Sequence, residues 1–549
     1  MSLEKSLTDI LEGEVSVKTD VIQEHSEDTS IFHIEPTCVV YPKHTEDVKK
    51  LVNYAADSGG MVSLTARSAG TDMSGGPLTN SVAVNFLKHF TKIKDVSATQ
   101  ATAEPGVFYR DFDKETLKFG VILPSYTASR ELNTVGGMVA NNSAGEKSLI
   151  YGKTERWVRA LKVVLSDGNE YEFKKLSFNE LQAKKAQDNF EGQFYREMES
   201  LIKDNIDLIE SEAPTVSKNS AGYAVWNVWD REEDSFDLIQ LFVGSQGTLG
   251  LITEITFDLI KPKPHSRMLV MFLRKRHMKV LGDLVNIVLK EKPESFESYD
   301  DKTFSVMLRI FPKLIGKLGG NPFKVLWGFL PETKMILTGG IPKMVLMAEF
   351  AGDTEEGVIA AAKKAEAEVL ENYAVSTHVT RTKNEAQKFW TIRRESFKLL
   401  RENVHGKHTA PFIDDISVRP ELLPEFLPKL YEIMADYKLL FTIAGHIGDG
   451  NFHIIPLMDF SRPDFTDIIK DLSERVYTLV GEYDGSITGE HNDGLIRTPY
   501  LNRMFSDEML MIFQQAKNIL DPQGIFNPHK KVNGDMDLLF SSIKKNVKD

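Results

Sequence analysis

Cysteine is nearly absent from this chain of 549 residues, in which Cys38 is the only one. A single thiol excludes a disulfide within the chain, a cysteine-ligated iron–sulfur cluster and a cysteine-rich zinc ribbon. This usage fits a reducing compartment. Cys38 itself lies in the apolar stretch TCVVY, where a free cysteine usually serves as a small core residue.

Long hydrophobic runs and basic charge are scarce as well. No run of ~18 apolar residues is present, so no membrane-spanning helix is expected. The N-terminal stretch MSLEKSLTDILEGEVSVKTD is too acidic and too polar for a secretory signal. With 66 Lys and Arg against 79 Asp and Glu, the formal net charge is -13. This balance argues against nucleic acid as a partner, because phosphate binding needs a basic face.

The length is sufficient for two or three domains, and two glycine-flanked motifs near the C-terminus carry the strongest chemical signal. They are TIAGHIGDGNFHIIP at Thr442–Pro456 and TGEHNDG at Thr488–Gly494. Apolar residues on both sides of Asp449–Gly450 predict two strands joined by a two-residue turn. With that turn, His446 lies directly opposite His453. Opposed residues of an antiparallel pair have Cβ atoms ~5 Å apart, so both imidazoles can reach one metal ion.

Glu490, in the second motif, supplies a third ligand and completes an open site of two histidines and one glutamate. Its neighbour His491 is left outside the ligand set. The alternative is an ordinary surface hairpin, which is the better interpretation of one isolated histidine. Four such residues in two glycine-flanked motifs favour the metal site.

Two glycine-rich loops in the N-terminal half expose backbone N–H groups between small side chains. They are RSAGTDMSGG at Arg67–Gly76 and NTVGGMVANNSAG at Asn133–Gly145. One such loop is as easily a connecting turn, but two anion-binding loops suit a diphosphate. Neither follows the pattern GxGxxG with an acid about twenty residues further on, which argues against a nicotinamide-binding Rossmann domain.

The motifs GHIGDGNFH and GEHNDG resemble signature segments of the FAD-linked D-2-hydroxy-acid dehydrogenases, the group that includes glycolate oxidase, D-lactate dehydrogenase and D-2-hydroxyglutarate dehydrogenase. The resemblance extends over most of the chain. It implies that His446, His453 and Glu490 bind a divalent metal, with Zn preferred over Mn. It also implies that His491 is the catalytic base.

The same resemblance gives a role to Arg393, in the predicted helix EAQKFWTIRRESFKLLR. This arginine matches the one that holds the substrate carboxylate, and a guanidinium is suited to bidentate binding of a planar carboxylate. Arg394 lies about a third of a turn away and is expected to be a solvated charge.

Both glycine-rich loops resemble the FAD-binding segments of the vanillyl-alcohol oxidase and p-cresol methylhydroxylase type, as do EPGVFYRDF, LKVVLSDG and LFVGSQGTLGLITEITF. Members with covalent flavin often carry a histidine where this chain has Thr71, so the resemblance implies noncovalent FAD. The residues that it assigns to the cofactor are Arg67, Ser68, Ala69, Gly70, Thr71, Ser74, Gly75, Thr134, Gly136, Gly137, Asn141, Ser143, Gly145, Gly152, Gly247, Ile252 and Asn527.

The implied fold class is α+β, with a two-subdomain FAD-binding domain of the p-cresol methylhydroxylase type, an α+β substrate-capping domain and C-terminal helices. We expect an N-terminal extension at 1–32, the FAD-binding domain at 33–262, the capping domain at 263–480 and a C-terminal segment at 481–549 that completes the active site. After residue 263 the apolar pattern predicts a strand, a helix and a strand.

The expected activity is FAD- and metal-dependent oxidation of a D-2-hydroxy acid to the 2-oxo acid. Relatives that take a dicarboxylic acid tend to have polar or cationic groups where this chain has Ile413 and Ile455, so a monocarboxylate such as D-lactate is favoured. Two other interpretations remain open. One is a flavin-dependent oxidase or dehydrogenase of another alcohol, and the other is a flavin-binding protein whose metal is a structural clip.

Residues 302–344 form a gap in the resemblance, with seven Lys or Arg against one acid among Phe, Trp and Leu. This composition indicates either a segment in a membrane interface or an insertion that packs on its own core or on a partner subunit.

Without a cysteine cluster, reduced FAD must pass electrons to a quinone, an electron-transfer flavoprotein or an iron–sulfur partner. We therefore expect a cytoplasmic protein with peripheral contact to the inner face of the membrane.

Overall fold

The computed structural model describes residues 2–302, 340–403 and 408–544, which divide into two compact units. Unit 1 comprises Met1–Gly145, Tyr151–Pro262 and Ser486–Lys544, and unit 2 comprises Glu146–Ile150 and Lys263–Gly485. The chain therefore leaves unit 1, builds unit 2 and returns to unit 1. Of the basic and apolar segment predicted at 302–344, only the ends lie among the described residues.

The first sheet of unit 1 has four strands in the order β1-β2-β4-β3, and β4 runs parallel to both β2 and β3. Every residue of β4 is buried, as is typical of a parallel strand covered on both faces. Helix α3, Thr45–Asp57, packs on this sheet through Val48, Leu51 and Val52, whose helical spacing places them on one face. The strands are β1 Glu14–Ser16, β2 Cys38–Tyr41, β3 Leu64–Arg67 and β4 Val82–Asn85.

Cys38 lies in the middle of this core. Its side chain is fully buried, and burial raises the pKa of the thiol to about 12. The prediction of a small core residue is therefore confirmed.

The second sheet of unit 1 is antiparallel, with strands in the order β5-β6-β12-β7-β8. Buried and half-buried residues alternate along β12, because successive side chains of a strand point to opposite faces. A small third sheet has the order β10-β11-β9. The strands are β5 Ile93–Lys94, β6 Gln100–Ala103, β7 Val158–Val164, β8 Glu170–Lys174, β9 Leu176–Ser177, β10 Trp229–Asp230, β11 Ser235–Phe236 and β12 Leu251–Asp258.

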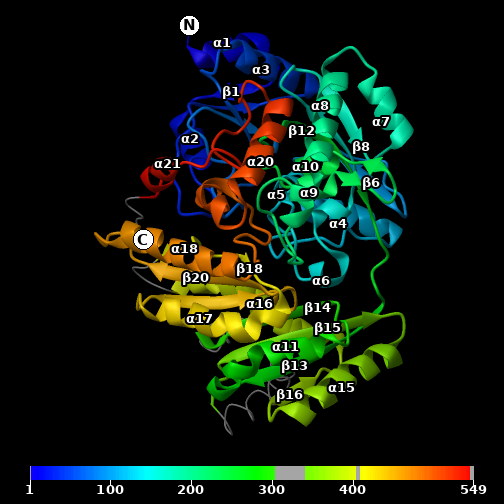
Figure 1. The fold of residues 1–549 in the computed structure, drawn as a ribbon, viewed down its shortest axis with the longest axis vertical. Coiled ribbons are helices and arrows are strands. Elements are labelled where there is room, and N and C mark those ends of the chain that lie inside the picture. Colours follow the sequence, from blue (N-terminus) through cyan, green and yellow to red (C-terminus); the bar gives the residue numbers. More distant parts are fainter. Residues whose placement is uncertain (1, 303–339, 404–407, 545–549) are drawn as a thin grey trace. The chain divides into compact units, whose positions relative to one another are not determined.

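Helix α20 lies beside α8 in unit 1, although the two are far apart in the sequence (Figure 1). The aromatic rings of Trp226, Phe505 and Phe513 cluster at the same helix. The remaining helices of this unit are α1 Leu3–Ile10, α2 Thr19–His25, α4 Tyr109–Thr116, α5 Val135–Asn141, α7 Phe178–Lys185, α8 Phe190–Asp204, α9 Ile206–Ser211, α10 Ile239–Phe242, α19 Gly494–Arg497, α20 Asp507–Leu520 and α21 Met536–Ser541.

Unit 2 is built on an antiparallel sheet with the order β16-β13-β15-β14-β19-β20-β17, in which β18 also pairs with β20. The predicted succession of strand, helix and strand after residue 263 is confirmed as β13, α11 and β14. The strands are β13 His265–Leu273, β14 Ser295–Asp300, β15 Met344–Gly352, β16 Ser376–Val379, β17 His408–Thr409, β18 Ile416–Ser417, β19 Leu440–Gly445 and β20 Asn451–Met458.

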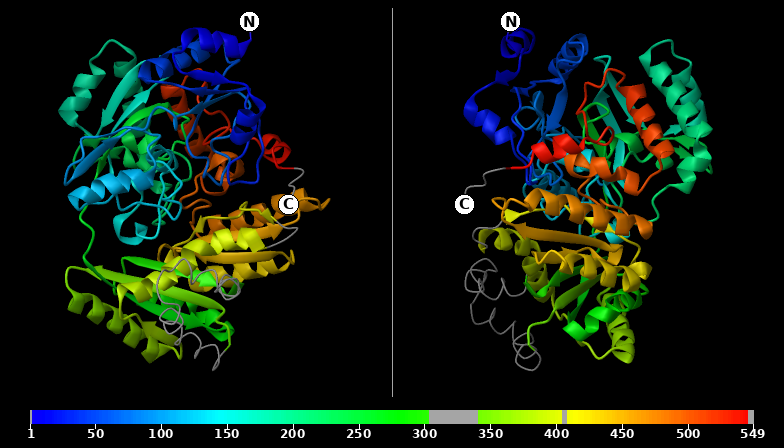
Figure 2. Two further views of the ribbon diagram at one scale, coloured as in Figure 1. Left: turned by 180° about the vertical axis from the view of Figure 1, so that it is seen from behind. Right: turned by 60° about the vertical axis from the view of Figure 1, so that its left-hand side comes forward.

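Helix α16, Lys383–Asn403, lies on this sheet (Figure 2). Its Phe389 and Trp390 pack against apolar residues of β13, β14 and β15. This packing confirms the helix that the sequence predicts at Glu385–Arg401 and fixes the positions of Arg393 and Arg394, which lie one turn after Trp390. The other helices of unit 2 are α11 Leu281–Leu289, α15 Glu355–Asn372, α17 Leu423–Ala435 and α18 Phe465–Glu482, and α6 Ser148–Tyr151 crosses the boundary between the units.

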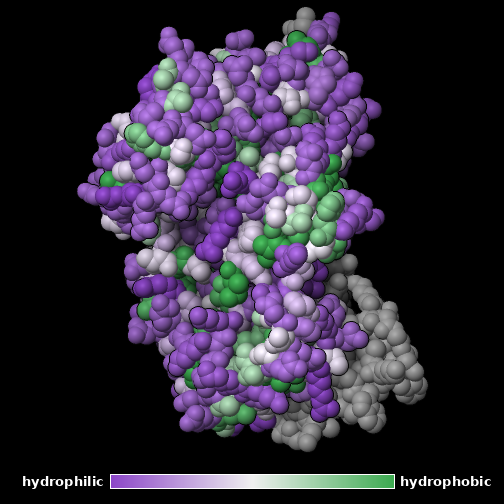
Figure 3. Space-filling view, turned by 90° about the vertical axis from the view of Figure 1, so that its right-hand side faces the viewer, coloured by the Kyte–Doolittle hydropathy of each residue, from purple (hydrophilic) through white to green (hydrophobic). Residues whose placement is uncertain are grey.

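The mixture of helices with parallel and antiparallel sheets confirms the α+β class. Among the described residues, no helix is long and apolar enough to cross a membrane. The face drawn in Figure 3 is mostly hydrophilic, with scattered apolar patches.

Candidate active site

Strands β19 and β20 form the hairpin predicted around the two histidines, but the predicted register is wrong. Ala444, rather than His446, is paired with His453. The connection is longer than a two-residue turn because the three residues after His446 form a turn of 3-10 helix. The amide groups of Asp449 and Asn451 both donate to the carbonyl oxygen of His446, which closes this turn.

The error in register amounts to two residues, and a shift of two leaves every side chain on its predicted face of the sheet. The imidazoles of His446 and His453 therefore still meet, with ring centroids 5.4 Å apart and ring planes at 83°. The structure thus brings these two predicted ligands together within unit 2.

Each of these imidazoles has a buried carboxylate at its Nδ1 atom. Glu297, on β14, accepts a hydrogen bond from His446 Nδ1 through Oε1. An oxygen of Asp414 lies 3.3 Å from His453 Nδ1. Glu297 is 1% exposed and Asp414 is 0% exposed. In both histidines Nε2 is consequently the nitrogen that does not face the carboxylate.

Arg393 contacts the same carboxylate as His446, since its Nε donates to Glu297 Oε2 at 3.1 Å. The expectation that Arg394 is a solvated charge is wrong. Its Nε donates to Oε2 of the buried Glu146 at 3.1 Å, its Nη2 donates to Oε1, and its guanidinium lies over the Trp390 ring. Burial of Glu146 requires a cationic partner, and the sequence gives no signal for a contact between residues so far apart.

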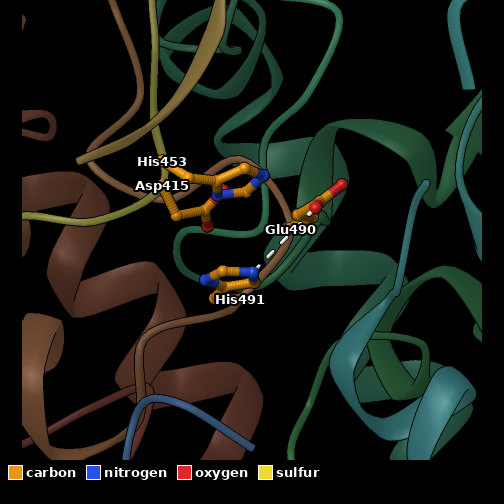
Figure 4. A group of neighbouring side chains, drawn as sticks. All are labelled: Asp415, His453, Glu490 and His491. Carbon is orange, nitrogen blue, oxygen red and sulfur yellow. Dashed lines mark ion pairs between the residues drawn. The ribbon is translucent and has the colours of Figure 1, made fainter. Parts of the chain in front are cut away.

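Asp415 is a further buried acid that the sequence analysis did not single out. Its backbone has a φ of +68°, and its Oδ1 accepts a hydrogen bond from Asn451 Nδ2 at 3.0 Å. Asp415 and His453, both from unit 2, are labelled in Figure 4. The available signal was the pair of acids inside the apolar run PFIDDISV, because charged residues are almost never buried in such runs without a partner.

The two isoleucines on which the substrate prediction rests are both buried in unit 2. Ile413 is 0% exposed and Ile455 is 6% exposed. Ile455 follows His453 by two positions on β20 and therefore lies on the same face of the strand. An apolar side chain thus stands next to one of the predicted metal ligands.

Glu490 and His491 lie in unit 1, on the segment between Ser486 and α19. Glu490 is 8% exposed, and its Oε2 accepts a hydrogen bond from Lys218 Nζ at 2.8 Å. The Oε1 atom lies 3.9 Å from His491 Nε2, as the dashed line in Figure 4 marks. The carboxylate therefore has a cationic group on one oxygen and an imidazole near the other.

Buried lysines hold the backbone of this segment. Lys153 Nζ donates to the carbonyl oxygen of Gly489 at 2.8 Å, and Lys531 Nζ donates to Asn492 Oδ1 at 2.8 Å. Asn492 donates in turn to the carbonyl oxygen of Asn141, which belongs to the second glycine-rich loop. The segment with Glu490 and His491 is therefore fixed directly to a loop that is predicted to bind FAD.

In the first glycine-rich loop, the prediction that the backbone N–H groups are open to an anion is wrong for three residues. The amides of Ser74 and Gly76 donate to Asp72 Oδ2, and that of Gly75 donates to Asp28 Oδ2. Burial and the neighbouring Asp72 carboxylate raise the pKa of Asp28 to about 7. Arg67 is buried as well, and its guanidinium donates to three backbone carbonyl groups of residues 24–27.

The two glycine-rich loops nevertheless meet. A Cβ atom on Gly137 would lie 2.9 Å from Ser68 Oγ, so the absent side chain permits this contact. Thr134 caps α5 by accepting a hydrogen bond from the Gly137 amide. Gln246, which the sequence analysis did not select, donates to Ser74 Oγ at 3.1 Å and thereby joins the loops through GSQGTLG.

The other predicted cofactor residues lie in or beside these loops. Asn527 donates to the carbonyl oxygens of Gly76 and Gln246. Gly145 has no room for a Cβ atom, which would lie 2.0 Å from the carbonyl oxygen of Tyr126. Buried residues are Gly136, Ser143, Gly152 and Gly247, and half-buried residues are Ala69, Gly70, Thr71, Asn141 and Ile252.

Comparison with known sequence families defines the class of protein. Residues 36–174 match the family described as "FAD binding domain", and residues 263–531 match "FAD linked oxidases, C-terminal domain". A solved structure, the 4-ethylphenol oxidase from Gulosibacter chungangensis, has the same fold, with a TM-score of 0.69, 15% identity and 97% of each chain covered. The fold is therefore that of an FAD-binding oxidase.

The names of curated relatives describe narrower classes of protein than the two domain families do. The chain is 25% identical over 515 residues to D-2-hydroxyglutarate dehydrogenase of Escherichia coli, covering 92% of this chain and 49% of that protein. It is 26% identical over 507 residues to glycolate oxidase subunit GlcD of Bacillus subtilis, covering 91% and 90%. It is 25% identical over 515 residues to D-lactate dehydrogenase of Anaerostipes hadrus, covering 92% and 91%.

The chain thus contains both an FAD-binding domain and the C-terminal domain of FAD-linked oxidases. It spans about half the length of the first of these curated relatives.

Proposed function

We propose that the chain oxidises a 2-hydroxy acid to the 2-oxo acid, using FAD and a divalent cation. The observation that carries this proposal is the pair of imidazoles in unit 2, His446 and His453, each with a buried carboxylate at Nδ1. Relatives named for D-2-hydroxyglutarate, glycolate and D-lactate support a 2-hydroxy acid as the class of substrate.

The donor set fits a divalent cation. Metal-binding histidines almost always pass their second N–H to a carboxylate or carbonyl group. His446 does so to Glu297, and an oxygen of Asp414 lies 3.3 Å from Nδ1 of His453. We infer that their Nε2 atoms and the carboxylate of Glu490 are the protein ligands, an open set that resembles catalytic rather than structural zinc sites. Two imidazoles and one carboxylate suit Zn better than Mn.

The residues of unit 1 fit FAD as well. The contact of Ser68 with Gly137 joins two loops of small residues, and backbone that is not shielded by side chains can approach a diphosphate closely. Thr71 offers no nucleophilic nitrogen for a covalent flavin link, so the proposed FAD is noncovalent.

If bound, FAD would accept the hydride that leaves the substrate Cα, and a cation held by His446, His453 and Glu490 would lower the pKa of the substrate hydroxyl group. His491 accepts the proton of this hydroxyl group, for which an imidazole is suited because it titrates near neutral pH. Arg393 binds the substrate carboxylate with its planar fork of N–H donors.

The preferred substrate in this proposal is a D-lactate-like monocarboxylate. Ile413 and Ile455 are apolar and buried, and a second carboxylate beside them would lose its hydration without a partner. A quinone, an electron-transfer flavoprotein or an iron–sulfur protein receives the electrons, at the membrane if residues 302–344 lie there.

An anaerobic screen of D- and L-2-hydroxy acids tests the proposal, with loss of the absorbance of oxidised flavin as the readout. We expect D-lactate to bleach the flavin, D-2-hydroxyglutarate to act more slowly, and removal of the cation with a chelator to abolish bleaching until Zn²⁺ is restored. A chelator that lowers the melting temperature without affecting bleaching would instead support the structural clip.

A further inference from the structure

Glu297 combines two contacts that the proposed reaction does not account for. It lies on β14, it is 1% exposed, and its two carboxylate oxygens are bound to different groups. The Oε1 atom binds Nδ1 of His446, and the Oε2 atom binds Nε of Arg393 at 3.1 Å. Both partners are residues with a role in the proposed function.

We propose that Glu297 is a positioning residue that sets the tautomer of His446 and couples this histidine to Arg393. A carboxylate between a guanidinium and an imidazole accepts hydrogen bonds only, so the proton of His446 must be on Nδ1. In that tautomer Nε2 carries a lone pair and can bind a cation. The inference rests on the proposed function, because it gives His446 the role of a metal ligand.

The second histidine supports this interpretation. Asp414, which is 0% exposed, has an oxygen 3.3 Å from Nδ1 of His453. The two carboxylates come from different parts of the chain, Glu297 from β14 and Asp414 from the residues before β18. A buried carboxylate from an independent part of the chain thus lies at Nδ1 of each imidazole, as expected for paired metal ligands.

The contact with Arg393 distinguishes Glu297 from Asp414. Arg393 reaches the carboxylate from α16, the helix that packs on the sheet through Trp390. Loss of the Glu297 carboxylate removes a contact of Arg393 and a contact of His446 together. A change at Glu297 should therefore weaken binding of the cation and of the substrate carboxylate, whereas a change at Asp414 should act on the cation alone.

The substitution Glu297→Gln separates tautomer control from simple packing. A glutamine has one acceptor oxygen, and both neighbouring groups need an acceptor. If the glutamine oxygen faces Arg393, the amide N–H group faces Nδ1 of His446. Nδ1 must then accept a hydrogen bond, so the ring proton of His446 moves to Nε2, and a protonated Nε2 cannot bind a cation. We expect the affinity for Zn²⁺ to fall by about 10- to 100-fold, and KM for the hydroxy acid to rise.

The measurement is isothermal titration of Zn²⁺ into the chelator-treated, full-length protein with its FAD bound. Glu294→Gln is the matched control, because Glu294 is also buried at the start of β14 but pairs with Lys147 instead of a histidine. The control should bind Zn²⁺ as the wild type does. FAD content and the melting temperature of the metal-free protein show that each variant is folded.

Glu297→Asp provides a second variant if the glutamine variant does not fold. It keeps the charge, but its shorter side chain cannot span both partners, and the affinity for Zn²⁺ should again fall by about 10-fold or more. Wild-type affinity in the folded variants would overturn the inference while leaving the proposed function intact. Absence of Zn²⁺ binding by the wild type would overturn both the inference and the metal part of the proposed function.

Discussion

The side chain of Lys530 shows how strongly single residues respond to burial in unit 1. Its ammonium group donates to the carbonyl oxygen of Leu78, and the residue is 4% exposed. Burial lowers the pKa of Lys530 to about 7, although the carboxylates of Asp28 and Asp72 oppose this shift. The folded protein therefore releases a proton near neutral pH that an unfolded lysine would keep to ~10.4.

The difference in the pKa of Lys530 between the folded and the unfolded protein gives a prediction for Lys530→Met. Between pH 7 and pH 10 the unfolded wild type binds more protons than the folded wild type, so its free energy of unfolding rises with pH in this window. Relative to the variant, which lacks this group, the wild type should gain about 2 kcal/mol between pH 7 and pH 9. Urea unfolding at both pH values measures the gain, and an unchanged difference between the two proteins would refute it.

Some single residues could not have been found in the sequence. Glu297 is one of several acids in PESFESYDD, and the acids of PFIDDISV do not reveal which histidine Asp414 lies beside, because both histidines are far away along the chain. His446, His453, Glu490 and His491 could be selected, because glycine-flanked motifs with several ionisable groups are rare in ordinary loops. The sequence thus indicates the proposed metal ligands, but it does not indicate the carboxylates that lie at their Nδ1 atoms.

At the scale of elements, the hairpin of β19 and β20 shows which part of a fold the sequence specifies. The apolar residues on both sides of Asp449–Gly450 predict the two strands correctly. The turn is predicted wrongly because Asp449–Gly450 is a strong two-residue signal only when both residues close the hairpin. Here Asp449 ends a 3-10 turn that Gly450 caps, and the Gly450 carbonyl oxygen accepts a hydrogen bond from the Val418 amide, which short-range patterns do not reveal.

Gly450 offers a test of this element. Its φ is +62°, and a Cβ atom would lie 1.7 Å from the carbonyl oxygen of Val418. Gly524→Ala is the matched control, because Gly524 has a φ of +65° and no neighbour within 4 Å. A left-handed conformation alone costs about 1 to 2 kcal/mol, so we expect Gly450→Ala to lose at least twice the stability of the control in thermal unfolding. Equal losses in the two variants would show that the loop tolerates the side chain.

At the scale of the whole molecule, the path of the chain determines which unit carries each predicted site residue. Residues 486–544 return to unit 1 after the chain has built unit 2, and they carry Glu490 and His491 to the loops around Asn141. The composition of the chain predicts several domains, but it does not predict this return. The expectation that the C-terminal segment completes a site came only from the resemblance of motifs, and it stays a prediction.

The proposed reaction assigns the base to His491, which lies on the segment that returns to unit 1. The most direct test is the rate of flavin reduction by D-lactate in anaerobic stopped-flow experiments on the wild type and His491→Asn. We predict that the variant keeps its FAD and its Zn²⁺ affinity, because the segment is held by Lys153 and Lys531. Its flavin should be reduced more slowly by a factor of about 100 or more. Reduction at the wild-type rate would contradict the account.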